Sequence, residues 1–253
     1  MRIVKQIVWL IQFLTTIPLR TTISMEPEDY GRSLAYAPLI GLLLGGILAG
    51  CLYLLRLLFP ALISSLFLWV IYIFLTGGLH LDGLGDTADG LFSHRSKERI
   101  LEIMKDSRVG TNAVLALILV ILSYIFLVMQ IPTKFLGIIV FMPVIGRMAL
   151  PLGAGLEKYA RREGLGLHFI NFCGSKEILI GLSITAILSV LILGIKGILI
   201  LWIVGIILFL MIKFFAAKIE GITGDILGAV CELAQLVYLI AAYLIYLRPQ
   251  ILP

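Results

Sequence analysis

The sequence predicts an all-α membrane protein, and its composition is the first reason. Of the 253 residues, 60% are hydrophobic and only 14% are charged, whereas a soluble domain carries roughly 25% charged residues. The second reason is that the apolar residues form long runs, as membrane helices of about 20 residues require, and lack the alternation typical of membrane β-strands. We therefore expect residues 1–253 to form a single integral-membrane domain, a bundle of about seven transmembrane helices (six to eight). This excludes a disordered chain, a soluble enzyme and, despite the net charge of +5, a nucleic-acid partner.

The apolar runs define the expected helices in order. Seven of them are long enough to cross a bilayer: residues 34–58, 62–81, 112–131, 135–153, 178–194, 197–216 and 226–247. The segment Met1–Leu19 is also apolar but carries Arg2, Lys5 and Gln6, so it forms either an interfacial helix or an eighth span. No A-x-A-like site follows it, which argues against a cleavable signal peptide.

The positive charges predict how the spans are oriented. If the spans alternate in direction, 15 of the 20 Lys and Arg residues fall on one side and four on the other, and Arg147 lies within a span. Short loops rich in Lys and Arg face the cytoplasm. We expect a multi-pass protein of the cell (inner, cytoplasmic) membrane with its charged side in the cytoplasm.

The carboxylates lie on the same side, which this rule does not require. Fourteen of the fifteen Asp and Glu residues belong to the predicted cytoplasmic segments, together with all three histidines, and the fifteenth, Glu232, lies within the last span. Transporters generally use ionisable groups near the midplane and open to both faces. Chemistry on one face instead favours an enzyme with a polar cytosolic substrate.

The most informative segment is GGLHLDGLGDTADGL, residues 77–91. On a helix, Asp82, Asp86 and Asp89 share a stripe about 60° wide, where three anions repel one another unless a cation binds them. Carboxylates are ligands for Mg²⁺, which also takes phosphate oxygens. No Cys or His cluster accompanies the aspartates in sequence, and the three cysteines are far apart, so neither zinc nor a disulfide framework is predicted. The competing interpretation is an ordinary solvated acidic face.

Two other segments carry residues suited to phosphate. An amphipathic helix is predicted from residue 95 onward, and it ends in KDSRVGT (105–111), where Lys105, Ser107 and Arg108 stand beside Asp106. Arg161 and Arg162 belong to a glycine-containing loop. Both sets are suited to gripping a diphosphate or nucleotide, although ordinary juxtamembrane charge explains either of them as well.

Three ionisable residues lie at or inside the spans. Asp225 stands where the last span begins, and Glu232 follows two helical turns later on the same face. An uncompensated charge in lipid is costly, so Glu232 is expected to face the interior of the bundle. Arg147 is expected to pair with one of the acidic groups or to reach a phosphate at the mouth of the bundle.

Together these segments resemble one family, that of cobalamin synthase, the adenosylcobinamide-GDP ribazoletransferases. The resemblance covers nearly the whole chain and is carried by FLTTIP (13–18), GLHLDGLGDTADG (78–90), KDSRVGT (105–111) and TGDILGA (223–229) with Glu232. Gln235 departs from the pattern, since many members have an acidic residue there, and no chemistry is assigned to it.

The resemblance implies a substrate pair and a metal. The enzyme would join adenosylcobinamide-GDP to α-ribazole or its 5′-phosphate, giving adenosylcobalamin or its phosphate and releasing GMP, with Mg²⁺ as cofactor. A homo-oligomer is left open.

Within the segment 82–111 and its neighbours, we assign roles as hypotheses. Asp82, Asp86 and Asp89 bind one or two Mg²⁺ ions, and Asp106 or Asp225 completes the site. Asp89 is the first choice for taking the hydroxyl proton, with His80 or another acid such as Asp86 as the alternative. Lys105, Arg108, Arg161 and Arg162 hold the diphosphate and guanylate.

Two other functions remain open. A CDP-alcohol phosphotransferase of phospholipid synthesis runs similar chemistry, but its motif has Asp-Gly followed by Ala-Arg and acids at longer spacing, which this chain lacks. A transporter is the non-enzymatic alternative, disfavoured by the absence of carboxylates on the far side.

Overall fold

The computed structural model describes residues 2–164 and 166–248, and it confirms the all-α prediction. Within those residues the only β-type pairing is an isolated bridge between Tyr159 and Ile222. The helices are α1 (Arg2–Leu14), α2 (Pro27–Ser33), α3 (Ala37–Leu58), α4 (Ala61–Thr76), α5 (Leu79–Leu91), α6 (Lys97–Ile103), α7 (Thr111–Met129), α8 (Gly137–Leu156), α9 (Gly166–Asn171), α10 (Ser175–Leu193), α11 (Lys196–Ile219) and α12 (Gly224–Ala242). Short 3₁₀ turns at Leu34–Tyr36 and Thr133–Phe135 precede α3 and α8, and a π-helical turn, Tyr243–Leu247, extends α12.

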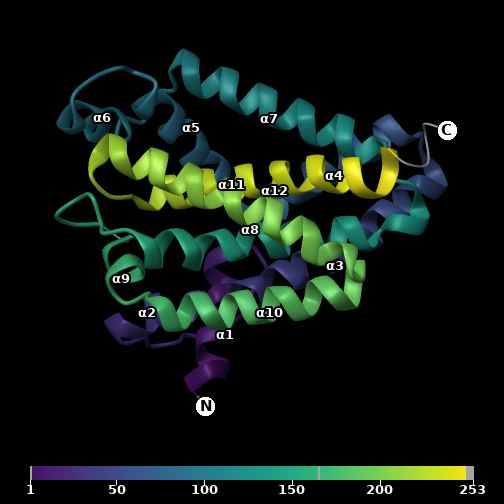
Figure 1. Cartoon of the computed structure of the whole chain (residues 1–253), viewed down its shortest axis with the longest axis horizontal. Coiled ribbons are helices and arrows are strands. Elements are labelled where there is room, and N and C mark those ends of the chain that lie inside the picture. The colour runs from purple at the N-terminus through teal and green to yellow at the C-terminus, as the bar shows by residue number, and fades with distance from the viewer. Residues whose placement is uncertain (1, 165, 249–253) are drawn as a thin grey trace.

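Six of the seven predicted spans are confirmed as single long apolar helices. Among the described residues, six helical segments are long and apolar enough to cross a membrane, the first running from Pro27 to Leu58 through α2 and α3. The others are α7, α8 with its preceding turn, α10, α11 and α12 with its π-helical extension. They run lengthwise through the bundle (Figure 1).

The second predicted span, 62–81, is wrong at its end. Helix α4 stops at Thr76, and Gly77 and Gly78 both adopt positive φ angles of 63° and 70°. That left-handed backbone is easily accessible to glycine alone, so the chain turns by 94° before α5 begins. Because of this bend, α5 does not continue along the direction of α4. Its three aspartates lie instead across one end of the bundle.

The N-terminal segment is not an eighth span. Helix α1 has 13 residues and is therefore about 20 Å long, too short for a hydrocarbon core of about 30 Å. Gln6 of α1 donates a hydrogen bond of 2.9 Å to Asp29 of α2, which fixes α1 against its neighbour.

The core of the bundle lies where α8 packs between α3 and α12. Gly45 of α3 faces the backbone of Val140, and an added Cβ would lie only 1.9 Å from that carbonyl oxygen. Small residues allow membrane helices to approach closely in this way. By contrast, α7, α10 and α11 expose large apolar side chains such as Leu119, Leu191 and Trp202, as expected of faces turned towards lipid.

One end of the bundle collects the polar segments. Helices α6 and α9 and the loop 157–164 lie together at the left of Figure 1, whereas α12 ends at the opposite side. Lys97 of α6 forms a 2.8 Å ion pair with Glu220 after α11, and Lys213 of α11 pairs with Glu157 at 2.6 Å. These contacts join segments far apart in the sequence into one polar end.

Candidate active site

The site forms where α5 crosses α12. Both helices offer a glycine at the contact: a Cβ on Gly83 would lie 2.7 Å from the carbonyl oxygen of Asp225, and one on Gly228 would lie 3.2 Å from the backbone of His80. Because there are no side chains at these two points, the backbones approach closely. The crossing places the aspartates of α5 beside Asp225, more than 130 residues away in the sequence.

Two of these carboxylates line a cavity of about 320 Å³. Asp82 comes from α5 and Asp225 from the start of α12, and Arg161 from the 157–164 loop forms a 2.8 Å ion pair with Asp225. Asp86 lies one turn along α5 from Asp82, and α5 is outside the six candidate spans. Burial raises the pKa of Asp86 to about 6, and the negative charges of Asp82 and Asp225 add to this shift.

This cluster suits a hard divalent cation. Three carboxylates, those of Asp82, Asp86 and Asp225, are offset by a single cation, Arg161, whose charge acts to lower the pKa of Asp86. Burial is the largest cause of the raised pKa of Asp86, and the negative charges of Asp82, Asp225 and Asp89 add to it. Oxygen donors with net negative charge are what Mg²⁺ selects, so the chemistry of these three side chains fits the predicted metal. In the structure their carboxylate oxygens do not all lie within 4.8 Å of one another.

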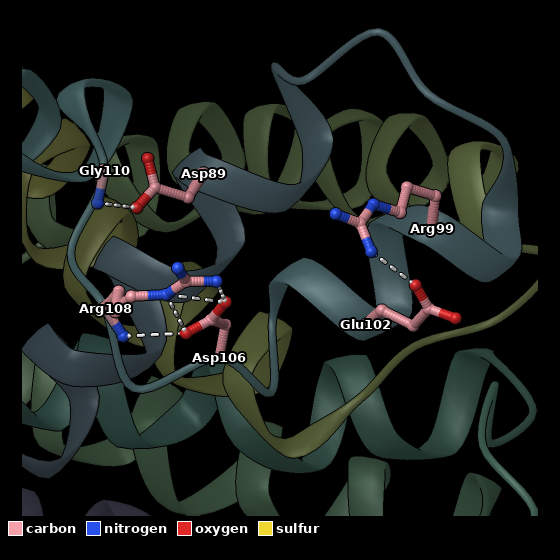
Figure 2. Close-up of polar contacts among 6 residues, drawn as sticks. All are labelled: Asp89, Arg99, Glu102, Asp106, Arg108 and Gly110. Carbon is pink, nitrogen blue, oxygen red and sulfur yellow. Dashed lines mark hydrogen bonds and ion pairs between the residues drawn. The ribbon is translucent and has the colours of Figure 1, made fainter.

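Asp89, our first choice for the proton acceptor, has a different environment. One of its carboxylate oxygens accepts a 2.6 Å hydrogen bond from the backbone N–H of Gly110 (Figure 2). The other accepts one of 2.9 Å from the backbone N–H of Ala113. These N–H groups belong to the start of α7, where helices lack partners for their donors and attract anions. The geometry of Asp89 is that of a helix cap that ties α5 to α7.

The KDSRVGT segment forms an internal ion pair. Asp106 accepts hydrogen bonds from the Arg108 side chain, the shortest 2.6 Å, as Figure 2 shows. This pairing lowers the pKa of Asp106 to about 2. Of the described residues lining the 320 Å³ cavity, the carboxylates are Asp82 and Asp225, so Asp225 rather than Asp106 lies with the α5 acids.

A second, basic cavity of about 490 Å³ lies next to the first. Its four cationic residues are Lys97 and Lys105 from the α6 region and Arg161 and Arg162 from the 157–164 loop, and they outnumber by one the three carboxylates of Glu98, Glu102 and Glu163 that also line it. Arg161 lines both cavities. The structure thus brings three of the predicted phosphate-binding residues, Lys105, Arg161 and Arg162, to one place. Ser107 and Arg108 are exposed and are not among the lining residues.

Arg147 and Glu232 lie in a fully buried cluster beyond His80. Glu232 faces the interior as predicted, and its carboxylate accepts a 2.6 Å hydrogen bond from the Tyr72 hydroxyl. Arg147 donates to that same hydroxyl over 3.3 Å. Neither Arg147 nor Glu232 lines the 320 Å³ cavity, whereas His80 does.

Sequence reasoning missed several members of this cluster, including Gln235, which donates a 2.9 Å hydrogen bond to the Tyr72 hydroxyl, and Tyr124, which donates one of 3.0 Å to the Glu232 carbonyl. Tyr72 bridges Arg147 and Glu232, and the Cys231 sulfur lies 3.3 Å from Nδ1 of His80. The side chains of His80, Cys231 and Glu232 thus have potential metal-ligand atoms within 4.8 Å of one another. No spacing in the sequence indicates this proximity. The only local signal was that Cys231 directly precedes Glu232.

Comparison with known proteins places the chain in one family. The family model described as cobalamin-5-phosphate synthase matches residues 6–243. This chain belongs to the cobalamin-5-phosphate synthase family. The match begins in α1 and ends after α12, so the family includes every helix that builds the site.

Relatives in this family carry one functional name. A protein named adenosylcobinamide-GDP ribazoletransferase from Acetivibrio thermocellus is 52% identical over 246 residues, 96% of this chain and 99% of the relative. Proteins of the same name from Clostridium acetobutylicum and Alkaliphilus metalliredigens are 46% and 40% identical, over 98% and 94% of their own lengths. No solved structure significantly matches the chain.

Proposed function

We propose that this chain is an adenosylcobinamide-GDP ribazoletransferase that uses Mg²⁺ and works at the cytoplasmic face of the cell membrane. The observation that carries this is the pairing of an acidic cavity, where Asp82 and Asp225 meet, with an adjacent basic cavity through Arg161. Full-length relatives with that name support the choice of substrates. Transfer of a phosphate-linked group needs charge compensation on both sides of the phosphorus that is attacked.

We assign the two cavities to different parts of the substrates. In our proposal the GMP portion of adenosylcobinamide-GDP binds in the basic cavity, held by Lys97, Lys105 and Arg162. Arg161, on the boundary, contacts the diphosphate. A ribose hydroxyl of the acceptor attacks the phosphorus attached to cobinamide, forming a new O–P bond while the bond to the GMP oxygen breaks. Mg²⁺ held by Asp82, Asp86 and Asp225 would neutralise phosphate charge during this exchange.

We assign the role of proton acceptor to His80 rather than to Asp89, and Asp86 to the metal. His80 lines the acidic cavity, and because its Nδ1 lies against Cys231, Nε2 remains to take the proton from the hydroxyl. Both carboxylate oxygens of Asp89 already accept hydrogen bonds from α7. We therefore assign Asp89 to holding α5 and α7 together, which in turn positions Asp82 and Asp86.

The direct test is GMP release by the purified protein with Mg²⁺. We expect release with adenosylcobinamide-GDP plus α-ribazole, and no nucleotide release with CDP-diacylglycerol plus an alcohol. Activity with only the second pair would replace our proposal with the CDP-alcohol phosphotransferase. Purified protein that releases nucleotide with neither pair would favour the transporter.

Substitutions separate the metal site from the helix cap. Asp82→Asn and Asp225→Asn should each lower kcat by at least about 100-fold, as removal of a catalytic electrostatic group does. His80→Gln should cost about 100-fold, in the range of general-base catalysis. Asp89→Asn, which keeps one acceptor oxygen, should cost less than about tenfold and mainly lower Tm, since cap substitutions cost about 1 kcal/mol. Near-normal turnover in the first two variants would refute the metal site.

A further inference from the structure

The 320 Å³ cavity is lined by two unlike sets of residues. One set, the polar wall, includes Asp82, Asp225, Arg161 and His80, with the Tyr159 ring. The other set is apolar, and its two phenyl rings, Phe13 at the end of α1 and Phe169 in α9, form what we call the aromatic wall. A metal site needs only the first wall, so the aromatic wall requires a separate explanation.

The aromatic wall is a stacked and well-anchored unit. The rings of Phe13 and Phe169 are stacked with centroids 5.1 Å apart, and Trp9 stacks on Phe13 at 4.9 Å. Tyr30 of α2 meets Trp9 edge-on at 4.9 Å. These rings come from α1 and α9, which are too short to span a membrane, and from α2, which begins the candidate span that α3 continues. A purely structural cluster would not need to place two of its rings in a cavity.

We propose that Phe13 and Phe169 hold the flat aromatic base of the acceptor nucleoside, and that its ribose points towards Asp82 and Asp225. This inference rests on the proposed function and assigns the acidic cavity to the acceptor. Aromatic side chains bind nucleobases by stacking, a contact that every fused aromatic ring offers. A base on this wall places the attached sugar hydroxyls at the carboxylate wall, where the phosphorus is attacked.

Size and charge exclude the other reactant from this cavity. A corrinoid ring with its adenosyl ligand is far too large for 320 Å³, whereas pockets for small ligands begin at about 300 Å³. The guanylate is anionic and matches the neighbouring cavity, where four cations outnumber three carboxylates. The fused-ring base is uncharged both in α-ribazole and in its 5′-phosphate, so the base can lie near the two carboxylates without repulsion.

Steady-state kinetics of the full chain tests the proposal. Phe13→Leu and Phe169→Leu should each raise KM for α-ribazole by about tenfold, the loss of one stacking contact, and change KM for adenosylcobinamide-GDP less than twofold. Phe13→Tyr, which keeps the ring, should restore KM for α-ribazole to within about threefold of the original protein. Phe92→Leu is the matched control, because Phe92 is an exposed ring after α5 that does not line the cavity.

Tryptophan fluorescence gives a readout that needs no turnover. Trp9 stacks on Phe13, so binding of α-ribazole should change the fluorescence of Trp9 in a saturable way. Trp9→Phe should abolish this change, although Trp69 and Trp202 remain in that variant. GMP alone should leave the Trp9 signal unchanged.

The outcomes distinguish this inference from the proposed function. If the original protein releases GMP but both Leu variants keep KM for α-ribazole unchanged, the aromatic wall is not the base site and the transferase assignment stands. A rise in KM for adenosylcobinamide-GDP instead would assign the wall to the donor and overturn the inference. If the original protein releases no GMP with this substrate pair, the proposed function itself fails.

Discussion

At the scale of single residues, burial and neighbouring carboxylates both disfavour the ionised form of Asp86. The pKa of Asp86 is raised to about 6 by burial and by Asp82 and Asp225. A raised carboxyl pKa means that the folded protein without metal is most stable when Asp86 is protonated. Stability from this group is therefore lost as pH rises from about 4 through 6.

Magnesium should reverse that loss. At pH 7 Asp86 is ionised and binds the metal, whereas at pH 5 a proton competes with the metal for the same oxygens. We expect Mg²⁺ to raise Tm more at pH 7 than at pH 5, measured by thermal unfolding in detergent against a chelator control. In Asp86→Asn the difference between the two pH values should shrink, and an equal Mg²⁺ effect at both pH values in the original protein would contradict the prediction.

Arg147 and Glu232 are two buried charged residues that differ in their ability to become neutral. Both are at most 1% exposed and both contact the Tyr72 hydroxyl. Breaking a buried charge pair costs about 3–5 kcal/mol. A carboxyl left alone can take up a proton and become neutral, but an arginine cannot.

Removing Glu232 should therefore cost more than removing Arg147. We expect Glu232→Gln to lower Tm more than Arg147→Met, and the double variant to be more stable than Glu232→Gln alone, as a double-mutant cycle would measure. Equal losses that add in the double variant would show that the two charges do not interact.

At the scale of helices, most of the helices were predictable from the sequence, but the contacts between them were not. The apolar runs predicted the long helices because about 20 apolar residues have few alternatives in a bilayer. The stripe of Asp82, Asp86 and Asp89 correctly placed all three on one helix. It did not indicate that Asp89 caps α7 or that Asp225 joins Asp82, because both depend on packing between distant segments. The break at Gly77–Gly78 had a visible signal, two glycines, which the length of the apolar run obscured.

The α5–α12 crossing depends on Gly83. A methyl group there would meet the Asp225 carbonyl oxygen at 2.7 Å, and backbone atoms on a packed helix move only at a cost. Gly83→Ala should push α12 away, lowering Mg²⁺ affinity and reducing kcat/KM for GMP release by about tenfold or more, since small misplacements of reacting groups cost up to about 100-fold.

Gly46 of α3 provides the matched control. A methyl group at Gly46 has nothing within 4 Å, so Gly46→Ala should leave activity unchanged and stabilise the helix by up to about 1 kcal/mol. Equal effects of the two substitutions would mean that the close approach at Gly83 is not needed for the site.

At the scale of the whole molecule, the uneven distribution of charge along the sequence corresponds to one charged end of the bundle. The cationic and acidic loops that alternation assigned to one side meet at one end of the bundle, joined by the Lys97–Glu220 and Arg161–Asp225 ion pairs. That end holds both cavities. The composition could predict that such an end exists, but the pairing of its loops required the fold.

The orientation of this end in the membrane can be measured by cysteine labelling of intact cells. Glu98 of α6 and Lys134 before α8 are both exposed and belong to opposite sides of the predicted topology. Positive-inside bias places Glu98 in the cytoplasm, so an impermeant maleimide should label Lys134→Cys on intact cells and Glu98→Cys only after permeabilisation. Of the native cysteines Cys173 and Cys231 are buried, so replacing Cys51 by Ala gives a low background. The reverse labelling pattern would place the cavities outside the cell, away from a cytosolic supply of nucleotide-activated substrate, and would overturn the proposed cytoplasmic active site.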